Sequence, residues 1–244
     1  MTDHSFWRIR PWQIATVVSV GVSAVGLLAL STVIPTPSLF VLAVVGFLGV
    51  ESVVFYRTNA VVRRDSGPQP FTAATLVTVL RGGAVVLLAG FVVVGRPPDE
   101  AAWLPALLFG AGALFDAFDG ALARATGSIS QLGSRLDVET DALVLLVGTA
   151  VAVRIGAAPA VFLLVGLARY AFVAGLFLRR LRDRAVGELP DRKSRRLLGA
   201  GLMVVVFLVL TPVLDPAVTR PLALGATIPF LLGFYRDWRL ITER

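Results

Sequence analysis

Four aspartates stand at fixed intervals near the middle of the chain. Asp116 and Asp119 are three residues apart, and Asp137 and Asp141 are four apart. Either spacing places both carboxylates of a pair on one face of a helix. Four clustered carboxylates repel one another unless a cation neutralises them, and an all-oxygen set suits Mg²⁺, Mn²⁺ or Ca²⁺. The segment is therefore a candidate metal centre.

The residues around the aspartates narrow the choice of metal and the class of ligand that the site could bind. The chain has no cysteine and its only histidine is His4, which argues against zinc. Arg124 carries a planar set of donors suited to phosphate, and Gly120 and Ala123 are small enough to let a ligand approach the backbone. Gly133 falls where the chain is expected to turn between the two pairs. Together these residues predict a pyrophosphate or nucleotide ligand, with one carboxylate left to act as a base.

The alternative interpretation is that the aspartates are helix caps or solvated loop charges. A single D-x-x-D pair would not exclude it. Carboxylates at the edge of a bilayer are costly, however, and are usually retained for function.

The elements that must position these residues are membrane-spanning helices. The chain has 244 residues, of which 56% are hydrophobic and only 16% charged, and its mean hydropathy is +0.80. The charges are clustered, and the apolar runs between them are long enough to cross a bilayer, which takes about 20 helical residues. The sequence therefore predicts an all-α, polytopic transmembrane helix bundle of about eight spans. Their expected ranges are 13–33, 38–56, 71–95, 102–119, 138–156, 159–179, 196–214 and 219–236.

The basic residues fall mainly on one side of these eight spans. The net charge is +7, and only Arg96, Arg154 and Arg220 lie on the opposite side. The positive-inside rule then places both termini and the aspartate segment on the cytoplasmic side of the cell membrane. Topology and lipid headgroups account for the basic residues, so no nucleic-acid partner is expected.

A change of composition at residues 57–70 divides the chain. The predicted domains are an N-terminal transmembrane hairpin (1–60), a basic Gly/Pro linker (61–70) and a six-helix catalytic domain (71–240). No function for the hairpin follows from its sequence. Glu51, in its second helix, is expected to snorkel to the surface or to pair with Arg57.

The aspartate segment resembles the signature of the CDP-alcohol phosphatidyltransferase family, D-x2-D-G-x2-A-R-x8-G-x3-D-x3-D. The resemblance covers about 70–240, and it implies a six-helix core with the signature on the second and third helices. Every fixed position is filled, without insertion, by Asp116, Asp119, Gly120, Ala123, Arg124, Gly133, Asp137 and Asp141.

The resemblance also implies a reaction, in which a phosphatidyl-type group passes from a CDP-linked lipid to an alcohol and CMP is released, in phospholipid biosynthesis. It implies two Mg²⁺ or Mn²⁺ ions, held by Asp116, Asp119 and Asp137 and partly by Asp141. Asp141 would also be the base. The donor would be a diacylglycerol or diether lipid, the acceptor a small polar alcohol, and the enzyme a homodimer, of which the sequence has no independent sign.

The CDP site implied by the resemblance extends to the first helix of the core. The family often has Asn, Thr and Arg there at three-residue steps. Thr78 and Arg81 match, whereas Thr75 stands where Asn is common. The whole expected CDP site is Asp116, Asp119, Gly120, Ala123, Arg124, Gly133, Thr78 and Arg81.

Residues outside the signature are expected to select the acceptor. Arg135, Arg169 and Lys193 are candidates for binding an acceptor that carries a phosphate. Arg169 lies within an apolar span and needs a partner or an aqueous pocket. The alternative for the basic cluster 179–196 is a cytoplasmic loop that contacts anionic lipid. Glu139 is two positions from Asp137, so it is expected to point away from the metal face as a solvated or interhelical charge.

A different functional class remains as the alternative, namely a divalent-cation transporter or sensor built on membrane carboxylates. Transport predicts acids near the middle of the bilayer on several spans, or inverted repeats. In this sequence the four aspartates gather at one expected membrane edge with an arginine among them, which favours the transferase.

Overall fold

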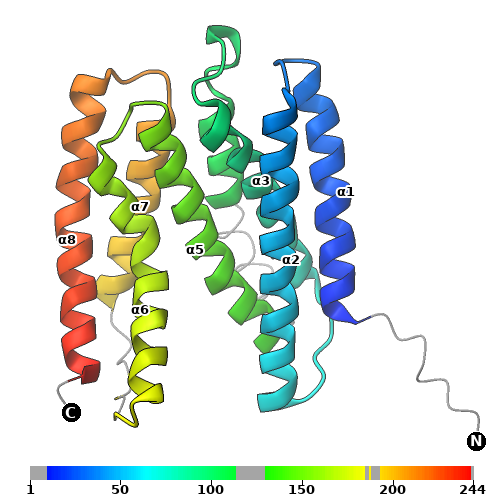
Figure 1. Ribbon diagram of the computed structural model, residues 1–244, viewed down its shortest axis with the longest axis vertical. Coiled ribbons are helices and arrows are strands. Elements are labelled where there is room, and N and C mark those ends of the chain that lie inside the picture. The colour runs from blue at the N-terminus through cyan, green and yellow to red at the C-terminus, as the bar shows by residue number, and fades with distance from the viewer. Residues whose placement is uncertain (1–9, 114–129, 185–186, 188–192, 243–244) are drawn as a thin grey trace, which may run out of the picture.

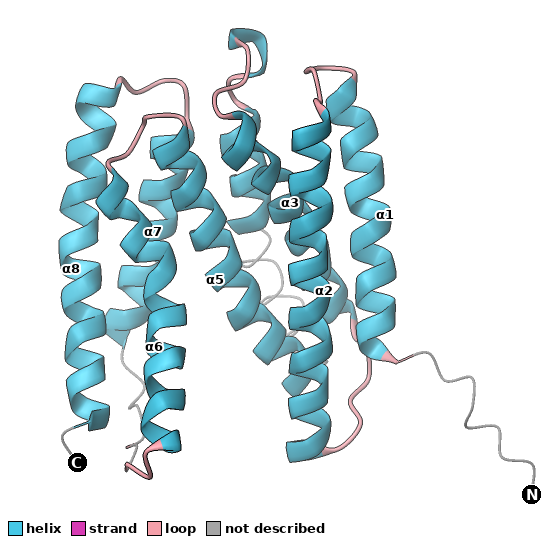
Figure 2. Cartoon of the chain, in the orientation of Figure 1, coloured by secondary structure: helices cyan, strands magenta, loops and turns pink. Residues whose placement is uncertain are grey.

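The computed structural model describes residues 10–113, 130–184, 187 and 193–242, without the side chains of 193, 194 and 196. These residues form helices and loops and no strand (Figure 2). The predicted all-α polytopic bundle is confirmed. Eight α-helices lie in the described parts, namely α1 (Pro11–Ser31), α2 (Ser38–Ser66), α3 (Ala73–Val94), a helix over residues 104–113, α5 (Gln131–Arg154), α6 (Leu163–Leu181), α7 (Lys193–Leu210) and α8 (Pro216–Thr242).

The helices run up and down, and α5 crosses obliquely between two groups (Figure 1). Helices α1, α2 and α3 lie on one side of α5, and α6, α7 and α8 lie on the other. Helix α3 is the most enclosed candidate span, with 67% of its apolar window buried against 22% for each of the other four. It packs against α1, α2 and α5, so its residues are held on three sides.

Five of the described helices are long and apolar enough to cross a membrane, namely α1, α2, α3, α6 with the short turn before it, and α8. Helix α5 has sufficient length, but its first half carries Arg135, Asp137, Glu139 and Asp141. The apolar part of α7, Leu197–Leu210, is shorter than a full span. The sequence thus predicted the number of helices. Their charge and length separate the five that could cross a membrane from the others in the described part of the chain, which are more charged or shorter.

The two largest differences from the predicted helix boundaries are at the end of α2 and the start of α5, and both affect the site. Helix α2 continues to Ser66, so residues 61–66, predicted as linker, form its last turns. Helix α5 begins at Gln131, about seven residues before the expected start, with Ser130 as its N-cap. Hydropathy follows the thickness of the bilayer, whereas a helix continues through polar residues for as long as its backbone bonds and caps allow.

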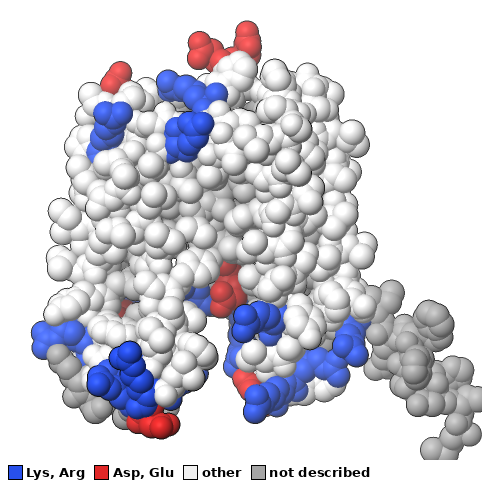
Figure 3. Space-filling model, in the orientation of Figure 1, with Lys and Arg blue, Asp and Glu red and all other residues white. Residues whose placement is uncertain are grey.

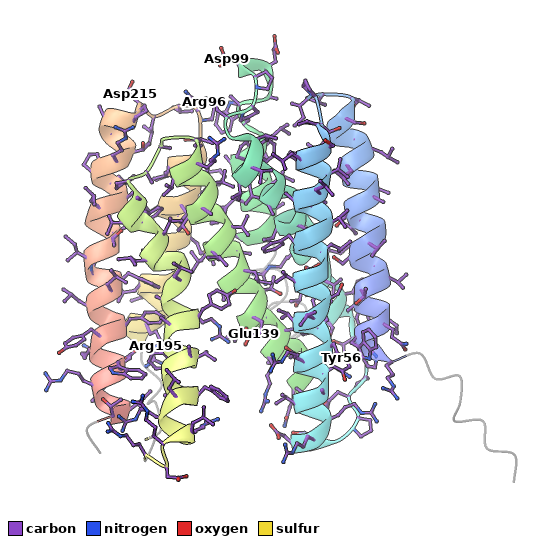
Figure 4. All side chains as sticks on the ribbon, viewed as in Figure 1. Tyr56, Arg96, Asp99, Glu139, Arg195 and Asp215 are labelled. Atoms are coloured by element: carbon purple, nitrogen blue, oxygen red, sulfur yellow. The ribbon has the colours of Figure 1, made fainter. Side chains whose placement is uncertain are left out.

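Basic side chains gather at the end of the bundle where α2 ends and α5 begins (Figure 3). Both described ends of the chain lie toward this end as well (Figure 1). The few basic and acidic groups at the other end include Arg96, Asp99 and Asp215 (Figure 4). Charge therefore distinguishes the two ends of the bundle.

Candidate active site

Arg81 on α3 joins three helices. Its side chain is 0% exposed. Its Nη1 lies 2.6 Å from Asp137 Oδ1, its Nη2 lies 2.5 Å from Asp141 Oδ1, and its Nε donates to the carbonyl oxygen of Gly112 at 2.7 Å. The guanidinium therefore fixes the position of both carboxylates relative to α3 and to the helix over residues 104–113.

Asp137 and Asp141 lie one turn apart on one face of α5. Their side chains remain 34% and 36% exposed, although the arginine between them is buried. Bonds from a guanidinium to carboxylates are short and strong, and the positive charge reduces the repulsion between the two acids. The predicted pairing of these two aspartates on one face is confirmed. The sequence did not predict that Arg81 would hold them, although a buried arginine in an apolar span always needs such partners.

Two threonines line the turns of α3 that precede Arg81. Thr78 is buried, and its hydroxyl donates to the carbonyl oxygen of Ala74 at 3.2 Å. Thr75, which stands where the family often has Asn, is also buried, and its Oγ1 lies 3.0 Å from Oγ1 of Thr72, the N-cap of α3. Their contact with CDP remains a prediction.

Gly133 does not mark a turn, contrary to the sequence-based expectation. It lies in the first turn of α5, where its N–H donates to Ser130 Oγ at 3.0 Å. A Cβ at this position would lie 3.1 Å from Ser130 Oγ and 3.3 Å from Thr75 Oγ1. The missing side chain therefore allows the start of α5 to pack closely against α3. Helix–helix contacts in membranes commonly use small residues in this way.

The other half of the signature lies outside the described residues, namely Asp116, Asp119, Gly120, Ala123 and Arg124. Among the residues that are described, no three acidic or histidine side chains form a group able to hold a metal. The two described carboxylates nevertheless suit a hard cation, because they are adjacent, all-oxygen and partly accessible. The predicted four-carboxylate centre remains a prediction.

Glu139 points away from the Asp137–Asp141 face and forms an ion pair with Arg169 of α6. The expectation of an interhelical charge is confirmed, and this pair supplies the partner that Arg169 requires within the membrane. Figure 4 shows Glu139 on the lower half of α5, between α6 and α2.

A groove of about 820 Å³ opens between α2, α5 and α6. Figure 3 shows it as a hollow between the two lower parts of the molecule. Arg135, Arg169, Glu139 and Tyr170 contribute to its lining, together with apolar residues such as Phe177. The Arg169 Nε and Tyr170 hydroxyl are buried, and neither has a hydrogen-bond partner among the described residues.

The three acceptor candidates have different surroundings. Arg135 pairs with Asp65 at 3.0 Å, and both side chains are 46% exposed. Arg135 and Arg169 line the same groove. Lys193 begins α7, but its side chain lies outside the described residues.

The fold and the site define a polytopic helical membrane protein with an arginine-bridged carboxylate pair. The family model for CDP-alcohol phosphatidyltransferase matches residues 71–232, two thirds of the chain. The chain therefore belongs to the CDP-alcohol phosphatidyltransferase family, whose members transfer a substituted phosphate group from a CDP-alcohol and generally use a divalent metal. No curated protein and no solved structure matches the chain.

Proposed function

We propose that this protein transfers a phosphatidyl-type group from a CDP-linked lipid to a small polar alcohol and releases CMP. The observation that carries the proposal is the Arg81 bridge, which orients Asp137 and Asp141 within the family-matched region. Two partly exposed carboxylates with a fixed orientation are suited to metal binding and proton transfer.

Divalent cations, Mg²⁺ or Mn²⁺, are proposed to be held by Asp116, Asp119, Asp137 and Asp141. When bound, they would neutralise the negative charge of the pyrophosphate and of the departing CMP. The donor set supports this assignment, since all four are carboxylates and the chain has no cysteine.

Asp141 is the proposed base for the acceptor hydroxyl. Its Oδ1 accepts a hydrogen bond from Arg81 Nη2. Arg81 is proposed to orient this carboxylate, because its guanidinium is buried and also holds Asp137 and the carbonyl oxygen of Gly112. The direct CDP contact that the resemblance implies for Arg81 stays a prediction beside this role.

The CDP moiety is proposed to bind at the helix ends next to this pair. The described residues proposed to line this site are Thr78, Arg81 and Gly133. The other proposed CDP contacts lie outside the described residues, namely Asp116, Asp119, Gly120, Ala123 and Arg124. The close approach of α5 and α3 at Gly133 supports a small, enclosed site. The lipid chains, diacyl or diether, would lie between helices and in the bilayer.

The acceptor is proposed to use the groove between α2, α5 and α6. Arg135 and Arg169 line it, and the buried donors of Arg169 and Tyr170 suit an acceptor with a negatively charged oxygen. Lys193 is retained as a third candidate. The basic end of the bundle, where the site lies, is proposed to face the cytoplasm.

The test is CMP release by the purified full-length protein in nanodiscs. The donors are CDP-diacylglycerol and a CDP-linked diether lipid, with Mg²⁺ or Mn²⁺ present. The acceptor panel is glycerol 3-phosphate, inositol 1-phosphate, serine and phosphatidylglycerol. Acceptor-dependent CMP release supports the proposal. No release with any pair overturns it, and Mn²⁺ uptake into proteoliposomes without CMP release would favour the transporter alternative.

A further inference from the structure

The N-terminal hairpin of α1 and α2 precedes the family-matched region, yet it packs on the side of α3 next to Arg81. Gly82 and Gly83 follow Arg81 directly. A Cβ on Gly82 would lie 1.8 Å from Glu51 Oε1 of α2, and a Cβ on Gly83 would lie 2.6 Å from Val22 Cγ1 of α1. The two glycines therefore form the surface on which the hairpin packs, at the level of the residue that holds the carboxylates.

Glu51 is enclosed at this contact. Its side chain is 1% exposed, and its Oε2 accepts a hydrogen bond from the hydroxyl of Ser19 on α1. The expectation that Glu51 snorkels or pairs with Arg57 is therefore wrong. Burying an acid among transmembrane helices is costly, and acids at such positions usually have a function.

The same α2 helix also reaches α5. Its last turn holds Asp65, which pairs with Arg135 at 3.0 Å, and Ser66, whose hydroxyl donates to Gln131 Oε1. Glu51 and Asp65 are fourteen residues apart, which is about 21 Å along a helix. Helix α2 is thus attached to α3 at one level and to α5 at another.

The two helices that α2 connects are those joined by the Arg81 bridge. Bonds of 2.5 and 2.6 Å from one guanidinium to two carboxylates tolerate little sliding between α3 and α5. A displacement of about 1 Å is enough to impair a catalytic arrangement substantially. Two attachments far apart along α2 resist both sliding and tilting of α3 against α5.

We infer that α2 positions the carboxylate site, and that Glu51 is a positioning residue that acts through Gly82 and Arg81 on Asp137 and Asp141. This inference rests on the proposed function in assigning metal binding to these aspartates. It gives the hairpin a role that its sequence does not suggest.

The test measures Mn²⁺ affinity of the full-length protein by electron paramagnetic resonance, without substrate, beside CMP release. Gly82→Ala should displace the Glu51 carboxyl, weaken Mn²⁺ binding about tenfold and lower kcat, because outer partners of metal ligands commonly contribute 10- to 100-fold. Glu51→Ala should do the same, whereas Glu51→Gln, which keeps the shape and the bond from Ser19, should retain most of the affinity. The combination Glu51→Asp with Gly82→Ala should recover affinity, since the shorter acid makes room for the new methyl group.

Gly46→Ala and Gly49→Ala are matched controls on α2, because a Cβ at either position meets nothing within 4 Å. Unchanged Mn²⁺ affinity in Glu51→Ala and Gly82→Ala overturns the inference. The inference is also overturned if the loss of Mn²⁺ affinity parallels the drop in thermal midpoint in every variant, including Glu51→Asp combined with Gly82→Ala. A purely structural contact would behave in that way. Mn²⁺ binding by a wild-type protein that releases no CMP would refute the proposed reaction and leave this test decisive. If the wild-type protein binds no Mn²⁺, both the positioning role of Glu51 and the proposed metal-dependent reaction are overturned.

Discussion

Arg81 Nη2 and Asp141 Oδ1 lie 2.5 Å apart and join α3 to α5 across sixty residues of sequence. The arginine is fully buried, whereas the aspartate is about one third exposed. The buried Arg81 therefore fixes the orientation of the Asp141 carboxylate, which still faces accessible space. This relationship supports the proposal that Asp141 is the base, and it makes Arg81 the residue on which the orientation of Asp141 depends.

Replacing the proposed base should stop the reaction while the protein still folds. Asp141→Asn keeps the shape and can still accept from Arg81, but it cannot take a proton from the acceptor. We expect kcat for CMP release to fall about 10²- to 10⁴-fold, the usual contribution of a general base. Asp99→Asn is the control, because Asp99 is exposed at the opposite end of the bundle (Figure 4). Full CMP release by Asp141→Asn would show that another group is the base.

Replacing Arg81 should affect both activity and stability. Arg81→Lys retains a positive charge, but an ammonium group cannot reproduce three N–H bonds in a planar fork. We expect CMP release by Arg81→Lys to fall at least tenfold. For Arg81→Met we expect the free energy of unfolding to fall by about 3 kcal/mol, because two acids lose a buried partner. Denaturant titration in detergent measures the second effect. Arg96→Gln, an exposed arginine at the other end, should change neither quantity, and wild-type activity in Arg81→Lys would contradict the bridging role.

Adding a side chain at Gly133 should separate the start of α5 from α3. The Cβ of Gly133→Ala would lie 3.3 Å from Thr75 Oγ1, so a small shift accommodates it. The larger Gly133→Val should not fit, and we expect it to lower kcat/KM for the CDP-lipid more than Gly133→Ala does. Gly199→Ala on α7 meets nothing within 4 Å and should stabilise its helix by up to about 1 kcal/mol. Equal kcat/KM values for the two Gly133 variants would exclude close packing as the reason for glycine.

Removing divalent cations should abolish CMP release reversibly. EDTA treatment followed by dialysis should leave no measurable turnover, and Mg²⁺ or Mn²⁺ should restore it. Zn²⁺ should restore little, because the proposed site has only carboxylate ligands. Asp137→Asn should raise the Mn²⁺ concentration needed for half-maximal activity. Turnover that persists after chelation would show that the chain departs from the metal use general in its family.

The Glu139–Arg169 pair separates an acceptor role from a structural one. If Arg169 binds the acceptor, Arg169→Gln should raise the KM for the acceptor about tenfold, the effect of losing one charge-assisted hydrogen bond. The exchange Glu139→Arg with Arg169→Glu should restore the thermal midpoint but not the acceptor KM. Recovery of both quantities in the exchange variant would show that the pair only joins α5 to α6.

The sequence predicted the helical class, the number of helices and the pairing of Asp137 with Asp141, because these follow from hydropathy and from the 3.6-residue period of a helix. It also predicted that Glu139 would turn away from that face. It misplaced the start of α5 and the end of α2, because helix length depends on caps and polar turns as well as on apolar runs. Gly133 was expected to mark a turn, yet it lies in a helix, at the contact between α5 and α3. Only the packing of α3 against α5 shows why a small residue is needed there.

The sequence by itself determined the membrane bundle, the family signature and the two acids of the described site, since each depends on local order along the chain. The tertiary structure decided which partners those acids receive. Arg81 and Asp141 are sixty residues apart, and Glu51 is thirty-one residues from Gly82. Such contacts arise when helices pack in a particular register, and that register is set by small residues and buried charges acting together.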